Sequence, residues 1–246
     1  MLPRSFALLA ALSTACAVAA DSDELPVVER EAVMTMNAMT MNALVLADKL
    51  HAMTLNGLTA EALVANPGVP EALEDPDARM FLRYLTACAL PAGARFEVVI
   101  DGRVQGFDGE LGLAPEWAGP QGSCGPSCRG WVSACMMARV NAHGEHVPIS
   151  IRGEHPALRA DRLELRDFPT FEAAYFGDVF APAQELLSCT ADGMPAPRVC
   201  GEGDSAGTCV IDTMGACQDV CARPARQRSY GICDDRTEVV TVYLGR

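Results

Sequence analysis

The sequence is short of lysine and of long apolar runs. Lys49 is the only lysine among 246 residues, and Asp and Glu outnumber Lys and Arg by 32 to 19, which gives a formal net charge of −13. An acidic surface repels phosphate groups, so we expect neither nucleic acid nor anionic lipid as a partner. Residues 1–20 hold the only apolar run near membrane length, so a protein with several membrane spans is excluded.

Common cofactor motifs are also missing. The chain contains no P-loop, no Rossmann glycine pattern and no HExxH zinc motif, so the sequence predicts no cofactor. Residues 101–110 combine three acids with glycines, but an EF-hand loop would need oxygen ligands where Arg103 and Gly112 stand, so a hairpin is predicted. A hydrophobic fraction of 50% with 21% charged residues is enough to bury the core of one medium domain or two small ones.

Residues 1–20 have the layout of a secretory signal peptide. Arg4 precedes the apolar run Phe6–Leu12, and residues 17–20 offer two small-residue cleavage sites before an acidic stretch. We therefore expect export to the periplasm or the medium, with no integral membrane segment after removal of the leader. Two alternatives are an ordinary N-terminal helix and a lipoprotein signal with Cys16 as the lipidated residue, although no leucine stands three places before Cys16.

The cysteine count agrees with export. Of eleven cysteines only Cys16 lies in the leader. The ten others are Cys88, Cys124, Cys128, Cys135, Cys189, Cys200, Cys209, Cys217, Cys221 and Cys233. An even number in an exported chain implies disulfides, and pairing within the early four and the late six would leave three and fifteen connectivities open. The C-x3-C pairs that begin at Cys124 and Cys217 could instead bind zinc, but zinc prefers tighter spacing and thiols in an oxidising compartment pair first.

A five-residue repeat follows the leader. It reads TMNAM and TMNAL over residues 35–44, then TLNGL and TAEAL over residues 54–63. Five is the period of neither a helix nor a strand. The repeat resembles pentapeptide-repeat proteins, which coil into a square β-helix, but the Asn-Ala-Leu order differs and the run is too short to bury its own core. We expect residues 21–74 to be a spacer or a loose helix.

The rest of the chain predicts a small disulfide-stabilised α+β fold. Its globular domain covers residues 75–187, and residues 188–246 form a cysteine-rich subdomain of loops and β-structure. Predicted helices run from a cap at Asp77 to Cys88, from Trp131 to Asn141, and through the aromatic stripe between Phe168 and Phe180, whose spacing of three and four suits a buried helical face. Predicted strands are Phe96–Ile100, Val104–Leu113, Val147–Ile151 and Thr237–Leu244.

Ser205 lies in the first motif with catalytic character. GDSAG at residues 203–207 resembles the nucleophile elbow of α/β-hydrolases, but that fold needs a histidine after the serine and the last histidine is His155. It also resembles the GDSGG of trypsin-like proteases, in which His143 or His146 would precede the serine. The spacing is too short for the two barrels of that fold, so a turn within a disulfide loop is predicted.

Cys128 lies in the second such motif. Residues 121–128 resemble the QGxCGxCW stretch of papain-like cysteine proteases, although Pro126 is inserted and two residues separate Cys128 from Trp131. That family also needs a histidine far downstream to activate the thiol, and even pairing leaves no free thiol. His143, His146 and His155 with nearby acids could bind a metal only if a turn brought them together, so a surface loop without a metal is predicted.

The TMNAL-type pentads, the stretch Cys88–Pro91 and the stretch Trp131–Cys135 together resemble exported cysteine-rich proteins of large-genome bacteria. The resemblance covers most of the mature chain, implies no known activity and transfers no functional residue. We expect an exported, non-enzymatic module that binds a protein or a glycan or is structural. The alternative is a secreted hydrolase with Ser205 or Cys128 as nucleophile and His143 or His146 as a base.

Overall fold

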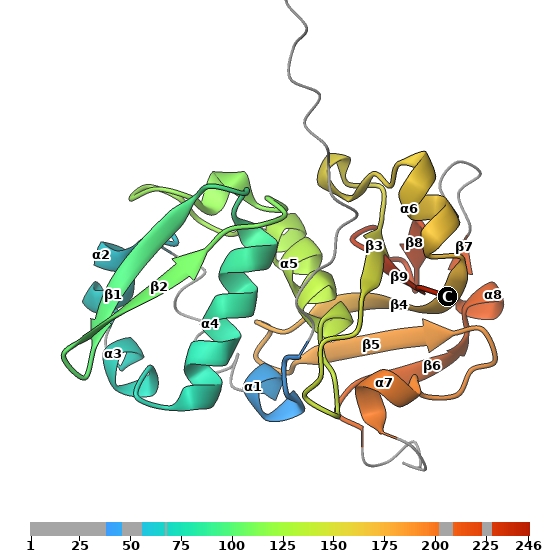
Figure 1. Cartoon of the computed structure of the whole chain (residues 1–246), viewed down its shortest axis with the longest axis horizontal. Coiled ribbons are helices and arrows are strands. Elements are labelled where there is room, and N and C mark those ends of the chain that lie inside the picture. The colour runs from blue at the N-terminus through green and yellow to red at the C-terminus, as the bar shows by residue number, and fades with distance from the viewer. Residues whose placement is uncertain (1–37, 46–55, 67, 202–208, 223–227) are drawn as a thin grey trace, which may run out of the picture. The chain divides into compact units, whose positions relative to one another are not determined.

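A computed structural model describes residues 38–45, 56–66, 68–201, 209–222 and 228–246, all within one compact unit. The helices are α1 (Met41–Val45), α2 (Ala60–Ala65), α3 (Val69–Ala72), α4 (Pro76–Ala89), α5 (Pro126–Ala138), α6 (Arg162–Asp167), α7 (Pro197–Cys200) and α8 (Cys217–Val220) (Figure 1). The strands are β1 (Arg95–Ile100), β2 (Arg103–Asp108), β3 (Ile149–Arg152), β4 (Thr170–Asp178), β5 (Glu185–Thr190), β6 (Asp212–Ala216), β7 (Cys221–Ala222), β8 (Ile232–Cys233) and β9 (Val240–Leu244). The predicted α+β class with disulfides is confirmed, and no helix among the described residues is long and apolar enough to cross a membrane.

A five-stranded sheet in the order β3-β9-β4-β5-β6 organises the fold. All neighbours are antiparallel except β5 and β6. The strands β5, β6 and β9, which lie largely after residue 187, pair with β3 and β4, which precede it, so one sheet unites both predicted parts of the chain. The predicted boundary at residue 187 falls inside β5.

The predicted aromatic helix between Phe168 and Phe180 is wrong, because most of that stretch is β4. Its side chains alternate between two cores, with Ala173 and Tyr175 in the larger and Ala174 and Phe176 in the smaller. The consecutive residues Ala173 to Phe176 are buried on both faces of the strand and are all apolar, so this stretch lacks the polar alternation that marks a half-exposed strand. The stripe nevertheless belongs to the core, as predicted, because the side chains of Tyr175 and Phe176 are 0% exposed.

The larger core lies between the sheet, α4 and α5. Trp117 and Phe81 each contact the ring of Phe180 edge-on, with centroids 6.0 and 6.2 Å apart. The predicted start of α4 needs correction, because Asp75 rather than Asp77 accepts the capping hydrogen bond. The helix α5 begins five residues before the expected Trp131, at a proline whose missing N–H costs nothing in a first turn.

The predicted β-hairpin is confirmed, although its second strand ends at Asp108 rather than at residue 113. Ile100 pairs with Arg103 across a two-residue turn, in which Asp101 and Gly102 both have positive φ angles. This backbone conformation matches a tight hairpin turn, for which Asp-Gly is a preferred pair.

The described part of the pentad segment is packed against the domain. The fifth residue of each pentad (Met39, Leu44, Leu58 and Leu63) is at most 3% exposed and belongs to the larger core. In two of the pentads the first residue caps a short helix: Thr40 Oγ1 accepts from the N–H of Ala43, and Thr59 Oγ1 accepts from that of Ala62. A threonine cap followed four residues later by a buried apolar side chain explains the period of five in these repeats.

The capping threonine of the fourth pentad gives a first prediction. Replacing Thr59 with Ala should lower the free energy of unfolding by about 1 kcal/mol, because the first turn of α2 loses its side-chain acceptor. Thr59→Ser is the matched control and should remain close to the wild type, since serine caps as well. Urea denaturation of the three proteins measures the difference, and equal midpoints for Ala and Ser would refute the capping role.

Candidate functional site

All ten cysteines outside residues 1–20 are paired in five disulfides. The pairs are Cys88–Cys135, Cys124–Cys128, Cys189–Cys217, Cys200–Cys209 and Cys221–Cys233. The early four and the late six each pair within their own group, which selects one of the connectivities left open by the sequence. The two C-x3-C motifs pair differently. Cys124 bonds to Cys128 within its own motif, whereas Cys217 and Cys221 bond to separate partners elsewhere in the chain.

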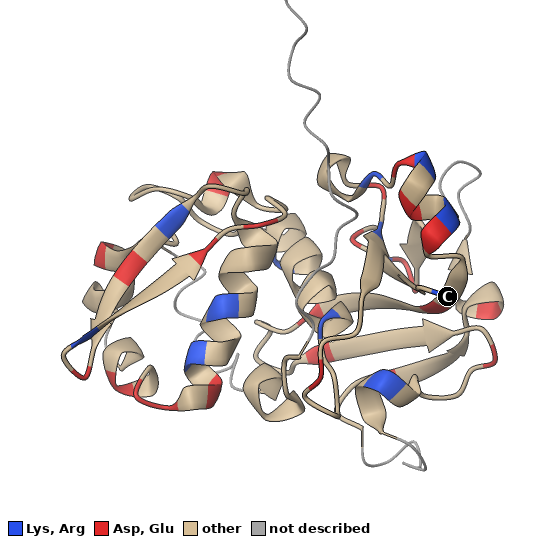
Figure 2. Cartoon of the chain, in the orientation of Figure 1, with Lys and Arg blue, Asp and Glu red and all other residues tan. Residues whose placement is uncertain are grey.

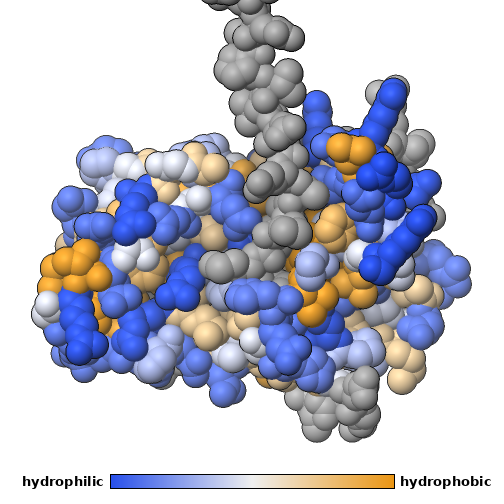
Figure 3. Space-filling model, in the orientation of Figure 1, coloured by the Kyte–Doolittle hydropathy of each residue, from blue (hydrophilic) through white to orange (hydrophobic). Residues whose placement is uncertain are grey.

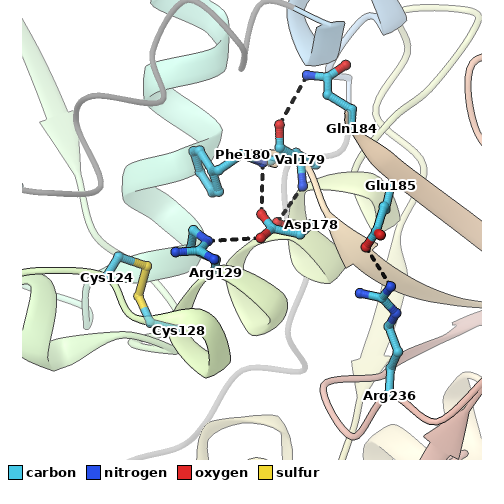
Figure 4. Close-up of polar contacts among 10 residues, drawn as sticks. Cys124, Cys128, Arg129, Asp178, Val179, Phe180, Gln184, Glu185 and Arg236 are labelled. Atoms are coloured by element: carbon cyan, nitrogen blue, oxygen red, sulfur yellow. Dashed lines mark hydrogen bonds and ion pairs between the residues drawn. A yellow bond between two sulfur atoms is a disulfide. The ribbon is translucent and has the colours of Figure 1, made fainter. Parts of the chain in front are cut away.

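The papain-like motif forms a short disulfide loop at the start of α5. Cys124 and Cys128 are 3% and 5% exposed, and their bond leaves neither with a thiol. The next residue, Arg129, turns its guanidinium away to Asp178 at the end of β4, where Nε lies 2.9 Å from a carboxylate oxygen (Figure 4). The other oxygen of Asp178 accepts from the backbone N–H of Phe180. This arrangement ties the helix to the central strand and leaves no activated sulfur.

The three candidate histidines differ in exposure and in their contacts. His143 and His146 are exposed in the loop before β3. His155 is half-buried, its Nδ1 accepts from the N–H of Ala157, and its ring lies edge-on to Trp131 at 5.3 Å. Burial lowers the pKa of His155, which outweighs the opposing attraction of Glu116. Among the described residues, none of these three histidines belongs to a group of three or more metal-ligand atoms.

The lowered pKa of His155 predicts a dependence of stability on pH. The unfolded chain binds the proton at a higher pH than the folded chain, so stability should fall as the pH decreases below about 6.5. His155→Asn keeps an acceptor for the Ala157 N–H and should flatten this dependence. Thermal melts between pH 5 and 8 test the prediction, with His143→Asn as an exposed control. If His155→Asn retains the full slope, the effect belongs to another group.

Ser205 lies outside the described residues. The loop that holds it is closed by the Cys200–Cys209 disulfide, across a sequence separation of 9. The disulfide encloses the motif as expected, whereas the predicted turn falls on residues outside the described ranges.

Buried charge is a feature that the sequence did not reveal. Arg198 and Glu172 form an ion pair of 2.6 Å in which both side chains are only 6% exposed. Arg198 also donates to the carbonyls of Ala138 and Val140, just at and after the end of α5. Each of these partners lies 26 or more positions from Arg198 in the sequence, and no local pattern indicates that they meet.

Arg152 forms a second buried polar network. Its guanidinium lies 3.9 Å over the ring of Tyr243 and donates to Ser150 Oγ and to the carbonyl of Phe168. Ser150 Oγ in turn donates to Glu164, 2.6 Å away. The contacts join β3, β9 and α6, so this network fixes the edge of the sheet.

The surface formed by the described residues has two hollows and an apolar face on the β1–β2 hairpin. One hollow, of about 520 Å³, lies beside Phe168 and Leu244, and the other, of about 630 Å³, lies between Thr59 and Phe96. Val99 is 67% exposed and pairs with Val104, which is 63% exposed, and Figure 3 shows apolar side chains over this hairpin. In Figure 2 the basic residues are scattered over several elements rather than gathered into one face.

The smaller core is built around sulfur. It contains Cys189, Cys217 and Cys233, with Cys221 packed against it. The Sγ atoms of Cys189 and Cys221 belong to different disulfides and lie 3.3 Å apart. In the sequence, only the C-x3-C spacing points toward this contact, because it places Cys217 and Cys221 within one helical turn. The sequence does not indicate that the sulfur of Cys189 lies against them.

Comparison with protein-family models, curated proteins and solved structures finds no match. The similarity to exported cysteine-rich proteins therefore stays a prediction, and the function has to be argued from the residues.

Proposed function

We propose that this protein is an exported module of the cell envelope or its surroundings, which binds a protein or a glycan or serves as a structural part and catalyses no hydrolysis. The observation that carries the proposal is the pairing of all ten cysteines beyond residue 20. Complete pairing is typical of proteins in oxidising compartments, whereas cytosolic thiols are kept reduced. The signal-peptide layout of residues 1–20 supports the same compartment.

The described residues support a binding role. The sulfur of Cys128 is held in a disulfide and cannot act as a thiolate nucleophile. His143 and His146 are exposed, and Ser205 lies outside the described residues. The exposed pair Val99 and Val104 offers apolar contact area, and the two hollows have volumes that are common for ligand sites. An acidic chain favours a partner that is neutral or cationic.

Export and oxidation are tested together in a bacterium with two membranes that expresses the chain with its own N-terminus. We expect the periplasmic fraction or the medium to hold a product that lacks residues 1–20 and has no thiol that reacts with N-ethylmaleimide in denaturant. A lipidated product beginning at Cys16 would assign the lipoprotein alternative. A full-length product with reactive thiols would overturn the proposal.

The absence of hydrolase activity needs its own test. The exported protein is treated with a fluorophosphonate probe for serine nucleophiles and with iodoacetamide for free thiols, with Ser205→Ala as the matched control. We expect no labelling by either reagent. Labelling by the fluorophosphonate that Ser205→Ala abolishes would overturn the non-enzymatic assignment in favour of a serine hydrolase.

A further inference from the structure

Two of the five disulfides are in direct contact. Cys189 on β5 bonds to Cys217 at the start of α8, and Cys221, immediately after α8, bonds to Cys233 on β8. The Sγ atoms of Cys189 and Cys221 lie 3.3 Å apart, and those of Cys189, Cys217 and Cys221 all lie within 4.8 Å of one another. Among the described residues this is the one group of three cysteine sulfurs at such distances.

The four cysteines differ in exposure. Cys189, Cys217 and Cys233 are 0% exposed, while Cys221 is partly exposed. Cys221 is therefore the one of these four cysteines with appreciable solvent exposure, and the Cys189–Cys217 bond is shielded from direct attack. Disulfide exchange requires a thiolate to approach a disulfide sulfur, so access decides which bond reacts.

We propose that Cys189–Cys217 and Cys221–Cys233 form one exchange-coupled unit, in which Cys221 carries thiol–disulfide exchange to the buried bond. Its external reactant is a dithiol, either a small molecule or the reduced active site of a thiol–disulfide oxidoreductase. This chemistry concerns the smaller core alone and goes beyond the proposed binding role.

The exchange proceeds in balanced steps. A thiolate of the external dithiol attacks Cys221 Sγ, and Cys233 leaves as a thiolate. The second thiol of the dithiol then attacks the mixed disulfide, so the dithiol is oxidised to a disulfide and Cys221 is released as a thiolate. Cys221 next attacks Cys189 Sγ, which lies 3.3 Å away in the folded chain. A Cys189–Cys221 bond forms, the Cys189–Cys217 bond breaks, and the Cys217 thiolate takes up a proton. One disulfide is reduced in total, and the last step is an isomerisation.

The experiment uses a variant that needs no external reductant. Cys233→Ala leaves Cys221 as a free thiol beside the intact Cys189–Cys217 bond. After hours at mildly alkaline pH, free thiols are trapped with N-ethylmaleimide in denaturant, and cleavage before Asp219 separates Cys217 from Cys221 for mass spectrometry. We expect label on both Cys217 and Cys221, in amounts within roughly tenfold of each other, because the exchange swaps one sulfur partner for another.

A matched control comes from the other C-x3-C disulfide. Cys128→Ala leaves Cys124 free, and among the described residues no second disulfide sulfur completes a close group around it. We expect the label to stay on Cys124 alone. Label that spreads to other cysteines in this control would show general scrambling and would overturn the assignment to the Cys189–Cys221 contact.

The reciprocal variant and the wild type keep the proposal testable if Cys233→Ala does not fold, which circular dichroism reveals. Cys217→Ala frees Cys189, which should attack Cys221 and move label to Cys233. Limited reduction of the wild type by dithiothreitol should yield a peptide pair linked through Cys189 and Cys221. Label confined to Cys221 in folded Cys233→Ala, or no such linked pair in the wild type, would overturn the proposal.

Discussion

Replacing Arg198 with Met should lower the free energy of unfolding by about 3–5 kcal/mol. The substitution leaves Glu172 as a buried charge without its partner, since both side chains are only 6% exposed. It also removes the donors to the carbonyls of Ala138 and Val140. Methionine is similar to arginine in length and keeps most of the packing, so the loss measures the polar contacts rather than a cavity. Chemical denaturation at neutral pH gives the value.

Two further variants separate the causes of this loss. Arg166→Met removes an exposed pair with Asp167, whose side chains are 66% and 49% exposed, and should leave the denaturation midpoint unchanged. The double variant Glu172→Leu with Arg198→Met should recover part of the stability, because no buried charge remains while the two carbonyls still lack their donor. If Arg198→Met is as stable as Arg166→Met, the buried pair has no stabilising role.

Local features of this fold were readable from the sequence, whereas contacts between distant segments were not. The hairpin around Asp101 and Gly102 follows from turn chemistry, and the α+β class follows from the mixture of periodicities. The aromatic stripe predicts a helix because helical spacing and a central strand buried on both faces both place apolar side chains at intervals of three or four. Pairing of β4 with β5 and β9 decides the case, and this pairing is set by residues far along the chain.

The candidate site shows the same division. The cysteine count and the grouping into four and six predicted disulfides, but the contact between Cys189 and Cys221 depends on how β5 and α8 pack. Likewise, the pair of Glu172 and Arg198 could not be read from two separate charges in an acidic chain. The pentads mark an intermediate case, because the capping role of Thr59 is local but the burial of Leu63 needs the surface of the domain.

The second large effect concerns the disulfide between α4 and α5. Replacing both Cys88 and Cys135 with Ala should lower the free energy of unfolding by about 4 kcal/mol, because the bond closes a loop of 47 residues in the unfolded chain. The matched control replaces Cys124 and Cys128 with Ala, and should lose only about 2 kcal/mol because that loop has a sequence separation of 4. Both replacements remove two buried sulfurs, so the difference between them reports loop closure.

Fluorescence of the two tryptophans during guanidinium denaturation without reductant measures both losses, since Trp117 is 0% exposed in the larger core. The slope of the free energy of unfolding against guanidinium concentration should rise more for the Cys88/Cys135 variant. Its unfolded chain expands further and exposes more surface. Equal losses would mean that the long-range bond stabilises through packing alone. A greater loss in the Cys124/Cys128 variant would instead show that the short loop at the start of α5 holds the helix in place, which chain entropy does not predict.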